Sequence, residues 1–311
     1  MPLFSIANQR LSVFEQANFL TEKALQHLIE GNLQAVFSCR LVASEFPTGA
    51  QHAGRIDTLA LSEDDNPVII EYKKVASSEL INQSLYYLAW IQDHRGDFEI
   101  AVQKALGTTA KVDWSDVRVI CIAPNYQKFD LYAVQVMGAN IELWTYRLFK
   151  NQLLYLEEVL QKSYVPPDAT PVTGKNPVMV AAGKKAAITR ATSTYTFEQH
   201  LDGKPPKIRD LAQAVQEYIM GLDPAIEEAP KKQYVAYKIS QNIACIECQT
   251  QRLVLFLKLN PKETPGLPGI ARDVTDIGHC GTGDLEIALR CSEDLEAAKP
   301  FIEMAYRKVG G

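Results

Sequence analysis

The segment 53–73 constrains the fold of this chain more than any other part of its sequence. Its two ends, 53–61 and 68–73, are rich in aliphatic and β-branched residues, which favours two strands. The stretch between them consists of Ser, Glu, Asp, Asn and Pro, the composition of a turn. The sequence therefore predicts a β-hairpin whose centre falls between Asp64 and Asp65.

This predicted hairpin brings charged residues together. Asp57 falls opposite Glu71 or Tyr72, and directly opposed Cβ atoms in a sheet lie about 5 Å apart. Because side chains alternate along a strand, Lys73 shares the face of Glu71. One face of the hairpin thus carries two carboxylates and one ammonium group.

Opposed carboxylates destabilise a sheet unless something compensates their charge. Mg²⁺ does so, because it prefers oxygen ligands and takes one or two carboxylates together with waters and substrate phosphates. Such an ion activates water, and Lys73 would position that water or stabilise the reacting phosphate. The alternative is a solvated hairpin with ordinary surface charges at Glu71 and Lys73, which fits poorly because both strands are otherwise apolar.

Asp57, Glu71 and Lys73 follow the pattern of the PD-(D/E)xK nuclease superfamily, which the chain resembles at these residues. It looks most like the RecB-like and archaeal mismatch-endonuclease branches. The resemblance implies a nuclease that uses Mg²⁺ or Mn²⁺ to hydrolyse phosphodiester bonds. Asp57, Glu71 and the backbone carbonyl of Tyr72 would be the metal ligands, and Lys73 would orient the water.

Two predicted helices flank the motif. The helix 78–94 carries Gln83 and Tyr87, which lie on one face because they are four residues apart. The resemblance implies that both contact substrate phosphate or metal-bound water; the alternative is that Tyr87 packs in the core. The helix 15–30 carries Glu22. The resemblance implies that Glu22 completes the site; the alternative is an ordinary, exposed glutamate on a helix.

The order of predicted elements fits the same superfamily. The predicted fold class is α/β, with a restriction-endonuclease-like core in which helices flank a mixed sheet, followed by a second, small α+β domain. The resemblance covers about residues 10–160. After the first helix, the predicted elements are a strand 33–45, the hairpin, the helix 78–94, a strand 117–123, a helix 128–136 and a strand 141–148.

Composition divides the chain of 311 residues into two domains and a linker. We expect a nuclease-like domain at 1–162, a linker rich in Pro, Gly, Ala and Lys at 163–193, and a domain of unknown function at 194–311. The last resembles an uncharacterised C-terminal domain family that is sometimes labelled a predicted transport protein. Its predicted helices are 197–201, 208–222 and 292–308, the last capped by Ser292, and its predicted strands are 233–239, 243–249, 252–259 and 285–289.

The charge and hydropathy of the chain limit its partners. A net charge of −5 argues against a broadly basic surface for nucleic acid, although phosphate contacts can be local. Candidate contacts are Arg55 and Lys74 beside the motif, and Lys238 and Arg252 in the second domain. No run reaches the roughly 18 apolar residues of a membrane span, and no signal peptide is evident, so we expect a cytoplasmic protein without membrane contact.

The sequence Cys245-Ile-Glu-Cys248, with His279 and Cys280 downstream, is a conceivable zinc site. However, Cys245 and Cys248 belong to a predicted strand, in which residues three apart point to opposite faces. Buried, reduced thiols are therefore the better interpretation.

Two functional hypotheses follow. The first is a Mg²⁺- or Mn²⁺-dependent nuclease, with DNA favoured over RNA. The second is a non-catalytic module that keeps the nuclease fold and binds nucleic acid or protein. A protein partner of the C-terminal domain and a homodimer are both possible, the latter because one such site cuts one strand at a time.

Overall fold

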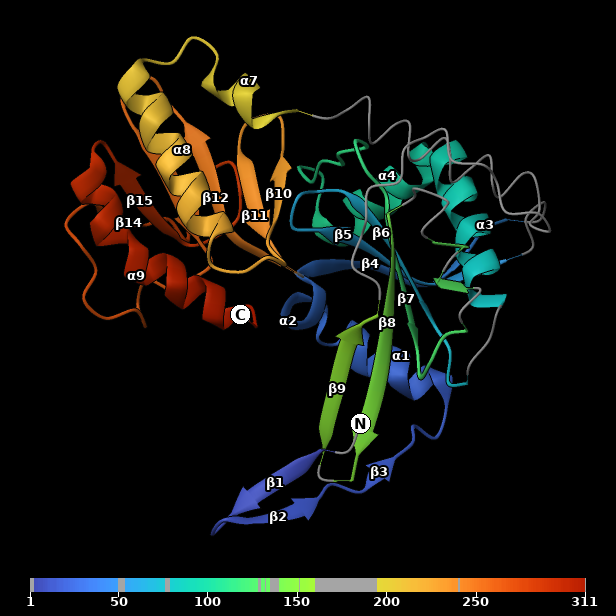
Figure 1. The fold of residues 1–311 in the computed structure, drawn as a ribbon. Helices are drawn as coiled ribbons and strands as arrows, with labels where there is room; N and C mark the ends of the chain where they lie inside the picture. Colours follow the sequence, from blue (N-terminus) through green and yellow to red (C-terminus); the bar gives the residue numbers. More distant parts are fainter. Residues whose placement is uncertain are drawn as a thin grey trace. The chain divides into compact units, whose positions relative to one another are not determined.

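The computed structural model describes residues 3–49, 54–75, 79–127, 130–131, 133–134, 140–150, 152–159, 195–239 and 241–310. The chain divides into two compact units, Met1–Ser193 and Thr194–Gly311 (Figure 1). The predicted linker 163–193 and most of the predicted helix 128–136 lie outside the described residues. In the parts that are described, no helix is long and apolar enough to cross a membrane.

The first unit is built on a seven-stranded mixed sheet with the order β3-β8-β7-β6-β5-β4, in which β9 also pairs with β8. The predicted hairpin is confirmed and forms its centre, with β5 (Arg55–Ser62) antiparallel to β6 (Pro67–Tyr72). Strand β6 then runs parallel to β7, and β7 parallel to β8. The remaining strands are β3 (Gln16–Ala17), β4 (Cys39–Pro47), β7 (Arg118–Ala123), β8 (Ile141–Phe149) and β9 (Leu153–Glu158).

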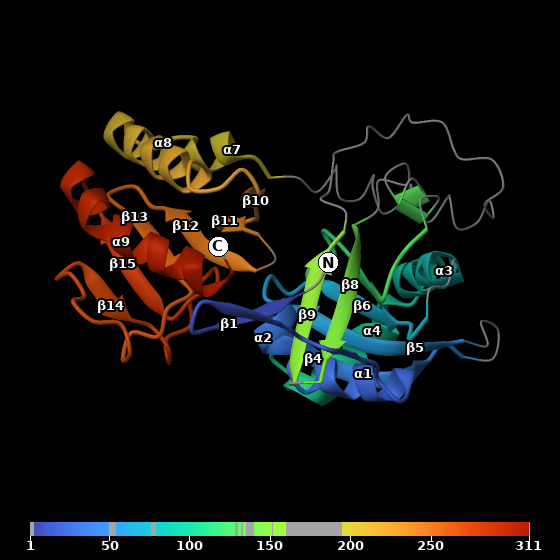
Figure 2. The ribbon, with the colours of Figure 1, turned by 60° about the horizontal axis from the view of Figure 1, so that its bottom comes forward.

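Helices cover both faces of this sheet. Leu59 and Ile69 pack into one core cluster with residues of α3 and α4, whereas Ile70 and Tyr72 pack into another with residues of α1 and α2. Because neighbouring residues of a strand point to opposite faces, β6 is buried on both sides. Figure 2 shows α1 and α3 on opposite sides of β5. The helices are α1 (Glu22–Glu30), α2 (Leu33–Phe37), α3 (Glu79–Asp93) and α4 (Arg95–Leu106).

Two predicted boundaries at the N-terminal end are wrong. The helix predicted at 15–30 begins at Glu22, because the Thr21 side chain accepts a hydrogen bond from the Ala24 N–H and caps it there. The strand predicted at 33–45 begins with helix α2 instead. Ser38 adopts a left-handed conformation with φ 52°, which ends α2 before β4 starts.

Several elements of the first unit were not predicted: helix α4, the two strands of an N-terminal hairpin, and the strands β3 and β9. Helix α4 directly follows α3, and its buried side chains, Phe98 and Val102, are too few to produce a clear apolar stripe. The N-terminal hairpin of β1 (Phe4–Ala7) and β2 (Arg10–Val13) is mostly exposed. It was missed although Arg10-Leu-Ser-Val13 alternates between polar and apolar residues, and Asn8 and Gln9 form its turn with positive φ.

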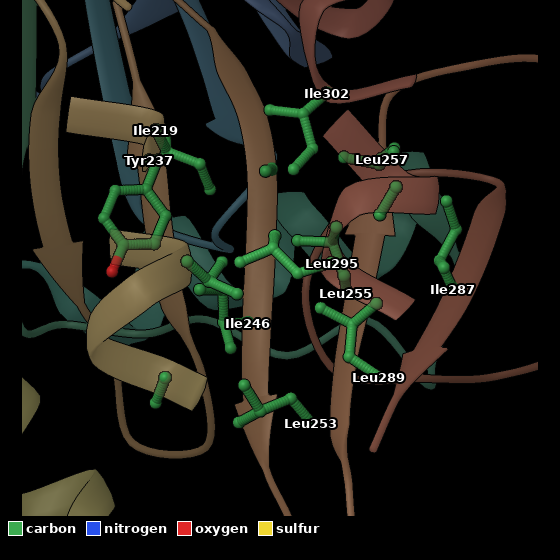
Figure 3. Packing of buried hydrophobic residues seen from close by; sticks show 14 of the residues in the cluster. Ile219, Tyr237, Ile246, Leu253, Leu255, Leu257, Ile287, Leu289, Leu295 and Ile302 are labelled. Carbon is green, nitrogen blue, oxygen red and sulfur yellow. The ribbon is translucent and has the colours of Figure 1, made fainter. Parts of the chain in front are cut away.

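The second unit is a six-stranded antiparallel sheet with the order β10-β11-β12-β13-β15-β14, packed against helices. Figure 3 shows Ile219 of α8 and Leu295 and Ile302 of α9 in one cluster with Leu255 and Ile287 of the sheet. The helices are α7 (Phe197–Leu201), α8 (Pro206–Met220) and α9 (Ser292–Lys308), and the strands are β10 (Glu227–Pro230), β11 (Val235–Lys238), β12 (Asn242–Cys248), β13 (Leu253–Leu257), β14 (Ala271–Asp273) and β15 (Leu285–Leu289).

The predicted fold class is confirmed in both units: helices flank a mixed sheet, and a small α+β unit follows. Cys245 and Cys248 face opposite sides of β12, because Cys248 packs with the helices and Cys245 with Phe256 on the other face. The predicted Ser292 cap of α9 is wrong, since Cys291 occupies that position and makes no side-chain capping bond. The short strands β10 and β14 were not predicted.

Candidate active site

Two carboxylates meet at one end of the β5–β6 hairpin. Backbone pairing between the strands runs as far as Thr58 opposite Ile70. Beyond this pair, the backbone N–H groups of Asp57 and Tyr72 donate to side-chain carboxylate oxygens instead of to backbone carbonyls. The Asp57 N–H donates to Glu71 Oε1 at 3.1 Å, and the Tyr72 N–H donates to Asp57 Oδ2 at 3.1 Å. The strands thus separate to admit both carboxylates, and each carboxylate is held by the backbone of the opposite strand.

The carboxylate pair is electrostatically strained. Glu71 is 0% exposed, and its Oε2 has no hydrogen-bond partner among the described residues. Burial raises the pKa of Glu71 well above its ordinary value, and the nearby charge of Asp57 raises it further. Burial also raises the pKa of Asp57, although the Tyr72 N–H and the charge of Lys73 oppose this shift. The pair therefore resists carrying two negative charges.

Lys73 and Glu22 lie next to each other beside this pair. The Lys73 N–H donates to the Ile122 carbonyl at 2.9 Å, which extends the parallel pairing of β6 with β7. Lys73 Nζ lies 3.3 Å from Glu22 Oε1, while Glu22 Oε2 accepts from the Lys74 N–H at 3.0 Å. Glu22 opens helix α1, so these contacts tie the start of that helix to the end of β6.

Gln26 and Glu30 are site residues that the sequence reasoning missed. Gln26 is buried, and its Nε2 donates to the Asp57 carbonyl at 2.7 Å and to Glu30 Oε1 at 3.0 Å. Glu30 also accepts from the Thr58 hydroxyl at 2.6 Å. Glu22, Gln26 and Glu30 are spaced four apart, so they line one face of α1. That polar stripe on an amphipathic helix is the signal from which they could have been found.

Gln83 and Tyr87 lie close to β5. The buried Tyr87 hydroxyl donates to the Arg55 carbonyl at 2.8 Å and accepts from the Arg55 N–H at 3.2 Å. Gln83 Nε2 donates to the same hydroxyl at 3.1 Å. Gly54 makes room for the ring, because a Cβ there would lie 2.9 Å from Tyr87 Cε1. Tyr87 therefore fixes the backbone of β5 two residues before Asp57.

The four basic candidates fall in different places. Arg55 forms an ion pair with Glu45, and Lys74 Nζ donates to the Leu20 carbonyl at 2.9 Å; both are exposed and flank the carboxylate pair in sequence. Lys238 pairs with the start of β12, whereas Arg252 lies in the turn after its end. The structure therefore does not bring Lys238 and Arg252 together.

The oxygen donors suit a hard cation. Over the described part of the chain, no group of three or more His, Cys, Asp or Glu side chains is arranged to hold a metal ion. Mg²⁺ needs fewer, because it commonly takes one or two carboxylates and fills its other positions with waters and substrate oxygens. Asp57 and Glu71, with the unpartnered Oε2, match that requirement.

Comparison with known proteins gives matches to both units. A family model described as a domain of unknown function (DUF5655) matches residues 197–308, which confirms the expected uncharacterised C-terminal domain. A Haemophilus influenzae protein described as uncharacterized is 30% identical over 311 residues, covering 99% of this chain and 100% of that protein.

Two solved structures also match part of the chain. One is described as the structure of an EndoMS–dsDNA2 complex, with 18% identity, a TM-score of 0.29, and coverage of 43% of this chain and 50% of that chain. The other is a repair endonuclease from Pyrococcus abyssi, with 18% identity, a TM-score of 0.26, and coverage of 42% and 49%. The match spans about half the length of each of these two chains.

Proposed function

This chain belongs to the family of the full-length Haemophilus influenzae relative, and from the chemistry of its own site we propose that it is a metal-dependent nuclease acting on DNA. The observation that carries the proposal is the pair of the fully buried Glu71 and the partly buried Asp57, with one carboxylate oxygen of Glu71 left unpartnered. A buried carboxylate oxygen without a partner destabilises a fold, so its retention points to a ligand. The agreement of Asp57, Glu71 and Lys73 with the PD-(D/E)xK pattern supports the same assignment.

Asp57, Glu71 and the Tyr72 carbonyl are the proposed ligands of Mg²⁺ or Mn²⁺. When bound, such an ion neutralises charge on the phosphate and lowers the pKa of coordinated water. The two carboxylates supply the negative charge that retains it. Because the backbone of the opposite strand already holds each carboxylate, little ordering is needed when the ion arrives.

Lys73 is proposed to act on the reacting groups. Its ammonium group is held beside the carboxylate pair by Glu22, so it can orient a water molecule toward phosphorus or stabilise negative charge on the phosphate oxygens. Gln26 acts as a positioning residue, because its amide fixes the carbonyl of Asp57.

The remaining candidates surround this centre. Tyr87 is proposed to position β5 through its two bonds to Arg55, with Gln83 bonded to the same hydroxyl. Arg55 and Lys74 are exposed on either side and are proposed to contact substrate phosphates.

A cleavage assay tests this function. The full chain is incubated with Mg²⁺ or Mn²⁺ and single-stranded, duplex and flapped DNA, and with RNA, beside Asp57→Asn and Lys73→Met. Each substitution is expected to lower the cleavage rate by about 10²–10³-fold or more, because each removes a charge that stabilises the transition state. Asp97→Asn and Lys104→Met, which alter exposed residues of α4, serve as matched controls and should cleave normally.

A second function is a non-catalytic binding module. It is favoured by the net charge of −5 and by the second unit, which has a hydrophobic core of its own. This alternative predicts nucleic-acid binding without turnover that persists in Asp57→Asn. If the wild-type chain cleaves, and either Asp57→Asn or Lys73→Met cleaves at the same rate, the proposed active site is contradicted.

A further inference from the structure

A polar cavity lies at the turn between β12 and β13 of the second unit. Its volume is about 410 Å³, and the Gln249 N–H closes the turn by donating to the Arg252 carbonyl at 3.0 Å. The lining includes two arginines and no carboxylate. The lining residues are Gln249, Thr250, Gln251, Arg252 and Arg290.

The strand register places the two arginines side by side. Leu253 of β13 pairs with Leu289 of β15, so the next step of this antiparallel ladder brings Arg252 opposite Arg290. Directly opposed side chains have Cβ atoms about 4.5–5.5 Å apart, and like charges there are destabilising. Both arginines also line the same cavity. Two positive charges are therefore concentrated at one end of the sheet.

The protein does not neutralise these charges itself. Arg252 Nε donates to the neutral Gln249 amide at 2.9 Å, and neither guanidinium forms an ion pair with any described residue. Nearby acids have other partners: Glu247 accepts from Gln249 Nε2 at 3.0 Å, and Asp294 accepts from the Arg290 backbone N–H at 2.7 Å.

Two of the other three arginines in this unit, Arg272 and Arg307, form ion pairs, whereas the exposed Arg209 of α8 forms none with the described residues. Arg272 of β14 lies 2.5 Å from Glu286 of the adjacent β15, and Arg307 lies 3.3 Å from Glu303 within α9. Arg252 and Arg290 differ from Arg272 and Arg307 in having no carboxylate partner among the described residues. Both line the same cavity at the β12–β13 turn.

We propose that Arg252 and Arg290 form a binding site for a phosphate monoester group. Guanidinium groups match phosphate oxygens with paired, parallel hydrogen bonds. The two guanidinium charges balance the two negative charges of a phosphate monoester. A phosphodiester of a nucleic-acid backbone carries one negative charge, so one arginine would remain uncompensated. Thr250 and Gln251 line the same cavity, and their side chains carry further hydrogen-bond donors.

Inorganic phosphate and the phosphorylated end of a nucleic-acid strand share this chemistry. Both should bind, and inorganic phosphate should displace a phosphorylated strand. A strand without a terminal phosphate should bind more weakly. The site is separate from the proposed nuclease centre, so its occupation does not depend on cleavage.

Fluorescence anisotropy on the metal-free full chain tests the site. The probes are a short labelled single strand with and without a 5′-phosphate, at constant ionic strength, with inorganic phosphate as competitor. The 5′-phosphate should raise affinity by about tenfold or more, the usual effect of charge-assisted hydrogen bonds. Arg252→Gln and Arg290→Gln should each abolish this gain, whereas the control Arg307→Gln should retain it.

Equal affinity for both strands, no competition by phosphate, or an unchanged gain in both variants would overturn the proposal. Thermal unfolding in phosphate-free buffer separates loss of binding from loss of fold. There, both variants should match or exceed the Tm of the wild type, because each relieves the opposition of like charges. A lower Tm in both variants would show that the arginines serve the fold, contrary to the proposal.

Discussion

Replacing Glu71 with Gln is expected to remove cleavage and, in metal-free protein, to raise stability. The substitution keeps the size of the side chain but eliminates a buried charge with an unpartnered oxygen. We expect the free energy of unfolding to rise by about 1–3 kcal/mol, because the variant no longer buries a negative charge beside Asp57. Cleavage should fall by about 10²–10³-fold or more, because one metal-ligating carboxylate is lost.

The gain from Glu71→Gln should depend on pH. The pKa of Glu71 in the folded chain is raised above its ordinary value of 4.5. As pH rises from 4.5 toward the raised pKa, the unfolded chain loses the proton while the folded chain keeps it, so wild-type stability falls. Gln does not titrate. The stability of the Glu71→Gln variant should therefore exceed that of the wild type most at pH values above the raised pKa, and little below pH 4.5.

Urea unfolding in EDTA at about pH 5 and about pH 8 measures this difference. Glu198→Gln, at an exposed position of α7, is the matched control and should change stability by less than about 0.5 kcal/mol. A Glu71→Gln chain that is less stable than wild type at both pH values, or that cleaves at the wild-type rate, would refute this prediction.

Replacing Arg118 with Met is expected to destabilise the first unit by about 3–5 kcal/mol. Arg118 Nε and Nη2 donate to the two oxygens of Glu142 at 2.7 and 2.8 Å, and these side chains are only 13% and 5% exposed. The substitution would leave the buried Glu142 carboxylate without its charged partner, with the Trp144 Nε1–H still donating to Oε2 at 3.1 Å. Thermal or urea unfolding measures the loss.

The double variant Arg118→Met with Glu142→Met should recover most of that stability, because replacing a whole buried ion pair with apolar residues is often nearly neutral. Arg40→Met is the matched control. It breaks an ion pair with Asp65 in which both side chains are more than 40% exposed, and should cost no more than about 1 kcal/mol. A loss below 1 kcal/mol for Arg118→Met would contradict the assigned burial.

The hairpin and its carboxylates could be predicted because local rules determine them. Aliphatic runs on both sides of a polar turn predict the strands, and the centre of that turn, between Asp64 and Asp65, places Asp57 opposite Glu71 or Tyr72. The structure has both contacts, since Asp57 bonds to Glu71 through its N–H and to the Tyr72 N–H through its carboxylate. In the second unit, the strand 285–289 and the helices 197–201 and 292–308 were predicted with their observed bounds.

Other features depend on contacts between distant parts of the chain. The partner of the Tyr87 hydroxyl is the backbone of Arg55, and no side-chain pattern specifies a bond to a backbone. Gln26 reaches the Asp57 carbonyl only because α1 packs across β5. Helix α2 has only five residues, too few to show a helical period, and it contains Val36 and Phe37, which favour strands.

Calorimetric titration of Mn²⁺ into the metal-free full chain tests whether Asp57 and Glu71 bind a metal ion. We expect one saturable site per chain. Binding should release protons, because it ionises the carboxylate pair, and the release is detected by comparing two buffers of different ionisation enthalpy. Asp57→Asn should weaken binding by about tenfold or more, the loss of one charged ligand. The absence of saturable binding, or binding of equal strength in Asp57→Asn, would contradict the assignment of this pair as a metal site.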